Sequence, residues 1–327
     1  MSTESKIRNE YMDFLKGIAI LATVAGHLLS DIPAGDTLFN IIYSFHMPLL
    51  FFVSAYIEES SRRKYMGREK NMLSKRAIGL LVPYFSWSLL YTYMHNGTVL
   101  EMNFILWKDI LLGNMYQGLW FLPVLFGLKI LHYLYWKMCN MVVKPALWKN
   151  ILMICLLESI TAVLALIVKQ TYLVNMLSYA IPYFFAVLIV DFDWVRKIIE
   201  EEWLLAFALL TYVLVFPFFS FYNTHWTTQV TRIGLSLCVI IVCWKLQGTW
   251  KESGFSKTIC HFGKYSLAIY LMHGFFSDGK LYLNRLESGF IVALLAVAMS
   301  FVIAVICVAI AKLIETSAWW NKMLFGK

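Results

Sequence analysis

Long apolar runs recur along the whole chain, and this feature restricts the possible folds more than any other. A membrane-spanning helix needs about 20 predominantly apolar residues. Segments that meet or nearly meet this requirement fall roughly at 11–30, 38–57, 77–94, 119–136, 150–168, 171–190, 203–221, 229–247, 259–277 and 289–314. The sequence therefore predicts an all-α, polytopic integral-membrane bundle of about ten transmembrane helices.

The composition agrees with a membrane protein and excludes several soluble classes. Hydrophobic residues make up 60% of the 327 residues and charged residues 15%, whereas a typical soluble protein has about 25% charged residues. A disordered chain, a coiled coil and a soluble Rossmann or barrel enzyme do not fit these values. The net charge is +8, but the basic residues stand in short clusters between apolar runs, so we expect no nucleic-acid partner.

The positions of the 28 basic residues predict the orientation in the bilayer. With the N-terminus in the cytoplasm, 21 of them fall in cytoplasmic segments and 4 in outer loops, and the other 3 lie within spans or at their edges. Because Lys and Arg accumulate in cytoplasmic loops, we expect both termini in the cytoplasm. The connecting segments are too short to fold alone, so we expect one membrane-embedded domain, residues 1–327, with no appended soluble domain.

The first span carries three ionisable residues, Asp13, Lys16 and His27. Such residues are costly in a membrane, and each is by default a functional hypothesis. At about 100° and 1.5 Å per residue, Lys16 and His27 lie about 20° apart around the helix and roughly 16 Å apart along it. Asp13 lies about 40° from His27 on the same face. A snorkelling lysine and a helix-capping histidine are the alternative, which does not explain why the two residues share one face.

Polar and aromatic residues in other spans give further candidates. In the second span, Pro48 predicts a bend, and His46 either lines a cavity or bonds a neighbouring helix. Arg76 ends a run of basic residues that either marks topology or binds ligand phosphates. Glu158 and Arg232 pair with each other or bind an acceptor. Three aromatic residues expected near the outer face either stack on a sugar or belong to the interfacial belt: Trp120, Tyr222 and Trp226.

Five motifs occur in order along most of the chain. They are Asp13 with Lys16-Gly17 and His27; Phe45-His-Met-Pro-Leu-Leu-Phe-Phe-Val-Ser54-Ala-Tyr56; Lys75-Arg76 leading to Pro83-Tyr84; Leu119-Trp-Phe-Leu122; and Gly263-Lys-Tyr-Ser-Leu-Ala-Ile-Tyr-Leu-Met-His273. Together they resemble the acyltransferase-3 family of integral-membrane acyltransferases, particularly sugar O-acetyltransferases similar to fucose 4-O-acetylase. The chain departs from the family pattern at Lys16, usually arginine, at Ala55, usually glycine, and at Gly79, where a second arginine would fall.

The resemblance implies transfer of an acetyl or another short acyl group from cytoplasmic acyl-coenzyme A to a hydroxyl of a cell-surface or lipid-linked glycan. By this reading His27 is the general base, Asp13 orders Lys16 or the donor, and Lys16 and Arg76 hold the donor phosphates. Acceptor-binding candidates are His46, Ser54, Trp120, Glu158 and Arg232, and no metal is expected. The resemblance also implies a multi-pass protein of the bacterial inner membrane. A transporter or flippase of a small or sugar-linked substrate is the alternative, since it would also carry intramembrane ionisable residues.

Overall fold

The computed structural model describes residues 3–61, 69–96, 118–140, 147–168, 171–222, 226–247, 249–251 and 253–327. This described part is helical and contains no strand. Each of the predicted apolar segments lies mainly on helices. Among the described residues, six helical stretches are long and apolar enough to cross a membrane: Glu10–Leu29, Pro33–Ser60, Trp148–Val168, Leu173–Asp191, Thr227–Leu246 and Gly289–Glu315. The prediction of an all-α membrane bundle is confirmed, while the number of spans and the side of the termini stay predictions.

The chain divides into two compact units, each formed from segments distant in sequence. Unit 1 consists of Met1–Glu59 and Phe185–Lys312, and unit 2 of Ser60–Phe184 and Leu313–Lys327. The helices that lie wholly or mainly in unit 1 are α1 (Thr3–Leu29), α2 (Asp36–Tyr43), α3 (His46–Ser60), α9 (Asp193–Glu200), α10 (Glu202–Val215), α11 (Trp226–Leu246), α12 (Gly254–Lys264), α13 (Ser266–Met272), α14 (Lys280–Leu283) and α15 (Gly289–Glu315). Short 3-10 turns complete the unit: η1 (Pro33–Gly35), η3 (Phe216–Phe218) and η4 (His273–Gly279).

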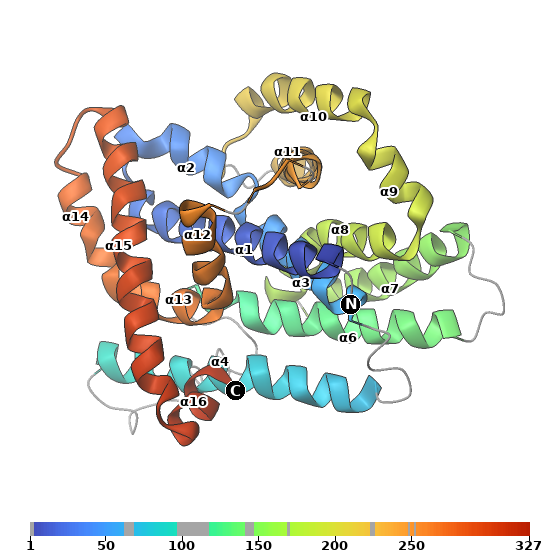
Figure 1. Cartoon of the computed structure of the whole chain (residues 1–327), viewed down its shortest axis with the longest axis horizontal. Coiled ribbons are helices and arrows are strands. Elements are labelled where there is room, and N and C mark those ends of the chain that lie inside the picture. The colour runs from blue at the N-terminus through green and yellow to red at the C-terminus, as the bar shows by residue number, and fades with distance from the viewer. Residues whose placement is uncertain are drawn as a thin grey trace. The chain divides into compact units, whose positions relative to one another are not determined.

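Helix α1 is the central helix of unit 1, and α12 lies alongside it (Figure 1). Two glycines allow the backbones to approach closely. A Cβ atom placed on Gly17 would lie 2.1 Å from the carbonyl oxygen of Ile259, and one placed on Gly263 would lie 1.8 Å from that of Asp13. Any side chain at either position would force the helices apart, so this contact fixes the register of α12 against α1.

Two of the predicted spans are broken into consecutive helices. In the second span the helix ends at Tyr43 and restarts at His46, and the Ser44 hydroxyl donates a hydrogen bond of 2.7 Å to the Ile41 carbonyl at the break. The bend predicted from Pro48 is confirmed, because Pro48 has no N–H to donate to the Ser44 carbonyl four residues earlier and its ring crowds that carbonyl, and the helix breaks at this point. The ninth span breaks at Tyr265, between α12 and α13.

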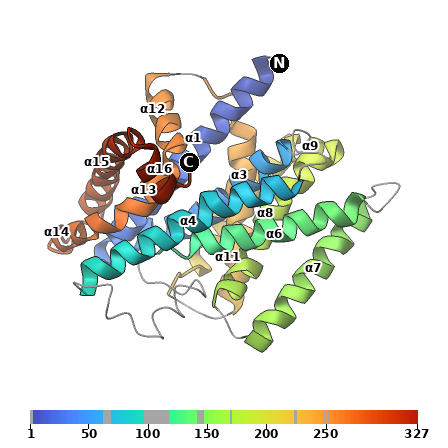
Figure 2. The same ribbon diagram turned by 90° about the horizontal axis from the view of Figure 1, so that it is seen from below.

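Unit 2 contains α4 (Glu69–Asn96), α6 (Phe121–Asn140), α7 (Leu147–Val168), most of α8 (Thr171–Asp191) and α16 (Ala318–Phe325). Figure 2 shows α4 beside α6 and α7 beside α6. Two side-chain hydrogen bonds hold α6 to its neighbours: Asn150 donates to the Tyr135 hydroxyl at 2.8 Å, and His132 Nδ1 lies 3.1 Å from the Tyr183 hydroxyl. The C-terminal α16 packs on α4, where the Trp87 indole N–H donates to the Leu324 carbonyl at 2.9 Å.

Candidate functional site

The candidate site of unit 1 surrounds His27, which stands in the last turn of α1. The His27 side chain is only partly buried, and its ring centroid lies 4.9 Å from that of His273. His27 also interacts electrostatically with His46 and Lys280. Three histidines and a lysine from four different elements therefore lie near one another at one end of α1.

The two partner histidines are buried and have defined tautomers. The His46 side chain is 3% exposed and that of His273 is 5% exposed. His46 Nδ1 lies 2.8 Å from the Ile42 carbonyl oxygen, and His273 Nδ1 lies 2.6 Å from the Tyr270 carbonyl oxygen. A carbonyl oxygen only accepts, so each Nδ1 carries the proton and each Nε2 is left as an acceptor in the neutral ring.

The fold brings His273 to His27 through the contact between α1 and α12. Gly17 and Gly263 set the register of these helices, and the chain then runs through the break at Tyr265 into α13, which also contacts α1. His273 follows directly on α13 as the first residue of η4. The Gly17–Gly263 contact near the N-terminal part of α1 thereby helps to position His273 against His27 at the other end of this helix.

An aromatic cluster joins His46 to the segment that follows η3. The Tyr43 ring lies 4.7 Å from that of His46 and 4.1 Å from that of Phe39, between ring centroids. Phe39 in turn stacks on Tyr222, with centroids 5.3 Å apart and ring planes only 11° from parallel. The side chain of Trp226, the third predicted aromatic residue at the outer face, lies outside the described residues.

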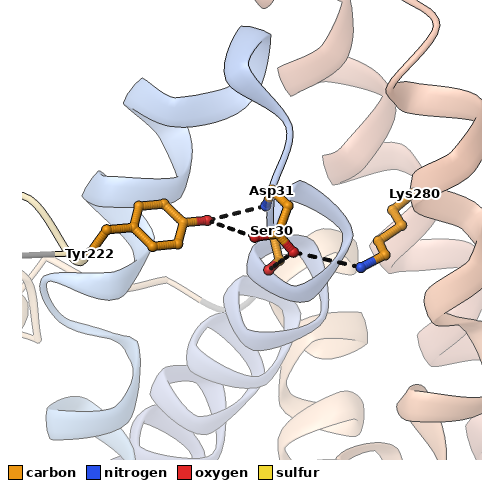
Figure 3. Close-up of polar contacts among 4 residues, drawn as sticks. All are labelled: Ser30, Asp31, Tyr222 and Lys280. Carbon is orange, nitrogen blue, oxygen red and sulfur yellow. Dashed lines mark hydrogen bonds and ion pairs between the residues drawn. The ribbon is translucent and has the colours of Figure 1, made fainter.

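Tyr222 also takes part in a polar network at the end of α1 (Figure 3). The backbone N–H of Asp31 donates to the Tyr222 hydroxyl at 3.1 Å, and the Ser30 hydroxyl donates to Asp31 Oδ2 at 3.1 Å. Lys280 Nζ lies 3.7 Å from the same carboxylate oxygen. Asp31 has a φ angle of 64°, which is left-handed backbone and allows the chain to turn sharply after the helix.

Asp13 and Lys16 lie on the same helix as His27, nearer to its N-terminal end, as the sequence predicted. Lys16 Nζ lies 3.4 Å from Asp13 Oδ1, and both side chains keep about a quarter of their surface exposed, at 24% and 22%. Asp13 is thus placed to orient Lys16, while the roles of both residues stay predictions. Because α1 is continuous from Thr3 to Leu29, one rigid element carries both Lys16 and His27.

The remaining predicted site residues divide between the units. In unit 1, Arg232 of α11 donates a hydrogen bond of 2.6 Å to Gln229 and interacts electrostatically with His46, and Ser54 lies partly buried in α3. Unit 2 holds Arg76, Trp120 and Glu158.

The residues of unit 2 belong to three different parts of the chain: Arg76 to α4, Trp120 to the turn before α6, and Glu158 to α7. Arg76 is partly buried in α4, and Trp120 stacks on Tyr179 with ring centroids 5.4 Å apart. Both carboxylate oxygens of Glu158 are buried and accept no hydrogen bond from any residue that the structure describes. The predicted pairing of Glu158 with Arg232, and the joint binding of a donor by Lys16 and Arg76, stay predictions.

Sequence reasoning did not include Asp31, Lys280 and His273 among the candidate site residues. His273 ends a recognisable motif, so its signal was present. Asp31 and Lys280 carry no such signal, since a charged residue in a loop beside a span is ordinary. Only the folded chain brings them to His27.

Several described helices are long and apolar enough to cross a membrane, and buried polar residues gather at one end of α1. These features define a polytopic membrane protein with an internal polar site. The model of the acyltransferase-3 family, described as an acyltransferase domain, matches residues 9–313. The chain therefore belongs to this family.

Two curated relatives are similar to short parts of the chain. Nodulation protein NolL of Sinorhizobium fredii is 34% identical over 92 residues, which cover 25% of this chain and 24% of that protein. Nodulation protein NolL of Mesorhizobium japonicum is 30% identical over 104 residues, covering 29% and 27%. The matched stretches thus span about a quarter of these relatives. No solved structure matches the chain.

Proposed function

We propose that the protein moves an acetyl or another short acyl group from cytoplasmic acyl-coenzyme A to a hydroxyl of a cell-surface or lipid-linked glycan, with His27 as the general base. The observation that carries this proposal is the placement of His27. It is the partly exposed member of a cluster whose other histidines are buried, and it shares α1 with the Asp13–Lys16 pair. A base that reacts with an incoming substrate has to be reachable, and His27 meets that condition.

The reaction balances with one base. His27 Nε2 takes the proton of the acceptor hydroxyl while the hydroxyl oxygen attacks the thioester carbonyl carbon. The carbon–sulfur bond then breaks, the acyl group remains on the acceptor as an ester, and coenzyme A leaves as the thiol after receiving the proton from His27. General-base catalysis of this kind contributes about 10²–10⁴-fold.

The donor is proposed to bind at the end of α1 that carries Lys16. The ammonium group of Lys16 offers donors for a phosphate, and its contact with Asp13 fixes its direction. Arg76 is the second proposed phosphate ligand. The roughly 16 Å between Lys16 and His27 along the helix suits the long, thin pantetheine arm of coenzyme A, which would present the thioester near His27.

The acceptor class and the location are proposed from the resemblance and from the relatives. The resemblance to sugar O-acetyltransferases favours a glycan hydroxyl, with His46, Ser54, Trp120, Glu158 and Arg232 as proposed acceptor ligands. Both matched relatives are bacterial, which supports a location in a bacterial inner membrane. The distribution of Lys and Arg supports both termini in the cytoplasm.

Transfer from radiolabelled acetyl-coenzyme A tests the proposal. Membranes containing the wild type or His27→Gln are incubated with the donor, and label is counted separately in glycan and lipid fractions. We expect label in one of these fractions with the wild type and none above background with His27→Gln.

The matched control is His261→Gln, which removes the imidazole of another partly buried histidine of unit 1, on α12, and should transfer normally. Each variant is checked by its yield of folded protein in detergent. Transfer by folded His27→Gln at the wild-type rate would exclude His27 as the base.

A further inference from the structure

The network at the end of α1 has the position of a substrate subsite. Asp31 follows His27 by four residues, just beyond the end of α1, and Lys280 both contacts the Asp31 carboxylate and interacts electrostatically with His27. Tyr222 bonds to Asp31 and stacks on the aromatic cluster that leads to His46. We propose that Asp31, Tyr222 and Lys280, the outer-end cluster, form the subsite that binds a sugar ring of the acceptor and directs one of its hydroxyls to His27.

The chemistry of these three side chains suits a hydroxyl-rich ring. A carboxylate accepts hydrogen bonds through two oxygens and about four lone-pair positions, and the Asp31 side chain is 69% exposed, so positions remain for sugar hydroxyls. The Lys280 ammonium, 41% exposed, supplies donors beside it. The cluster therefore presents an acceptor and a donor side by side, as neighbouring hydroxyls of a sugar require.

Tyr222 supplies an apolar surface for the face of the ring. Phe39 stacks on it nearly parallel, while 51% of the Tyr222 surface stays exposed. The Phe39 contact and the bond to Asp31 hold the ring in one orientation. A rigid aromatic side chain that is supported on one side offers contact area at a low cost in conformational entropy.

Stability alone does not explain this arrangement. A sharp turn after a helix needs only a residue that tolerates left-handed backbone, and glycine does so best. An exposed ion pair such as Asp31–Lys280 contributes little to folding. Yet the Asp31 backbone and carboxylate are fixed by contacts from Ser30, Tyr222 and Lys280. An exposed carboxylate that three neighbours contact, just beyond the helix that carries the proposed base, is what recognition of an acceptor needs.

This inference rests on the proposed function, and the experiment separates the two. The purified full-length protein in lipid nanodiscs receives radiolabelled acetyl-coenzyme A and a panel of octyl glycosides of fucose, galactose, glucose and rhamnose as probes. Variants are Asp31→Gly, which keeps the left-handed backbone without the carboxylate, Lys280→Met and Tyr222→Leu. Asp31→Asn serves as a second variant at that position if Asp31→Gly does not fold.

We expect each variant to raise the KM for the accepted glycoside about tenfold or more, with a smaller effect on kcat and none on the KM for acetyl-coenzyme A. The control is Asp36→Asn, an exposed carboxylate at the start of α2, which should leave all constants unchanged. A wild-type glycoside KM in the folded variants, or an equal rise in both KM values, overturns the subsite. Failure of the wild type to acylate any glycoside refutes the proposed glycan specificity itself.

Discussion

Substitution of Gly263 by alanine tests whether the backbone contact between α1 and α12 positions the site. The added Cβ would lie 1.8 Å from the Asp13 carbonyl oxygen, whereas ordinary contacts begin at 3.4 Å. The backbone of α12 fixes the position of this Cβ, and the oxygen belongs to the backbone of α1, so no side-chain rotation relieves the clash. The helices have to separate locally by about 1.6 Å, the difference between these distances.

The cost of this separation follows from packing energetics. Overpacking of this kind costs typically about 1–3 kcal/mol in stability, so Gly263→Ala should lower the Tm. The effect on activity should be larger, because a misplacement of about 1 Å at a catalytic group can cost about 10²-fold in rate. Since α12 leads through α13 to His273, a shift of α12 changes the position of His273 against His27. We therefore expect a loss of about 100-fold in kcat per folded molecule.

The assay measures Tm in detergent and acetyl transfer from radiolabelled acetyl-coenzyme A, normalised to folded protein. Gly17→Ala, whose Cβ would lie 2.1 Å from the Ile259 carbonyl oxygen, should behave in the same way. The matched control is Gly234→Ala in α11, where nothing lies within 4 Å of the added atom; it should keep its activity and gain up to about 1 kcal/mol from the better helix propensity of alanine. Equal activity and Tm for Gly263→Ala and Gly234→Ala would refute this reasoning.

Three further predictions concern single side chains. Lys16→Met should raise the KM for acetyl-coenzyme A, whereas Lys16→Arg should leave this KM nearly unchanged, because arginine keeps the positive charge. An equal rise of the KM in the two variants would contradict a phosphate-binding role. Glu158→Leu should raise the Tm, because it removes a buried carboxylate that accepts no hydrogen bond from the described residues. The same variant should raise the KM for the acceptor, and an unchanged KM would remove Glu158 from the proposed acceptor site. Ser253→Ala should lower the Tm by an amount equivalent to about 1 kcal/mol, because the reciprocal bonds between Ser253 and Ser256 cap α12; an unchanged Tm would show that this cap contributes nothing.

The sequence predicted that Asp13, Lys16 and His27 share one helix, α1, and there is a physical reason for this. Asp13, Lys16 and His27 lie on one continuous helix, and the position of a side chain around a helix depends only on its residue number. Their shared face therefore needed no tertiary information. The same holds for the apolar segments, since their length and hydropathy are local properties.

Sequence reasoning failed where the outcome depends on contacts between distant segments. The contact of Asp31 with Tyr222 joins residues 191 positions apart, and neither residue lies in a motif. The meeting of His273 with His27 depends on the α1–α12 contact, which periodicity within a single segment does not reveal.

The arrangement of unit 1 assigns separate tasks to separate parts of α1, and kinetics can distinguish them. Lys16 stands at the proposed donor end, and the outer-end cluster begins at Asp31 beyond the other end, with His27 between them along the helix. The Gly17–Gly263 contact lies near the donor end but acts on the histidine pair through the register of α12. Variants of Lys16 should therefore change the donor KM, variants of Asp31 the glycoside KM, and variants of Gly263 mainly kcat. If all three classes changed the same constant, α1 would be acting only as a structural support, and the division of tasks along it would be wrong.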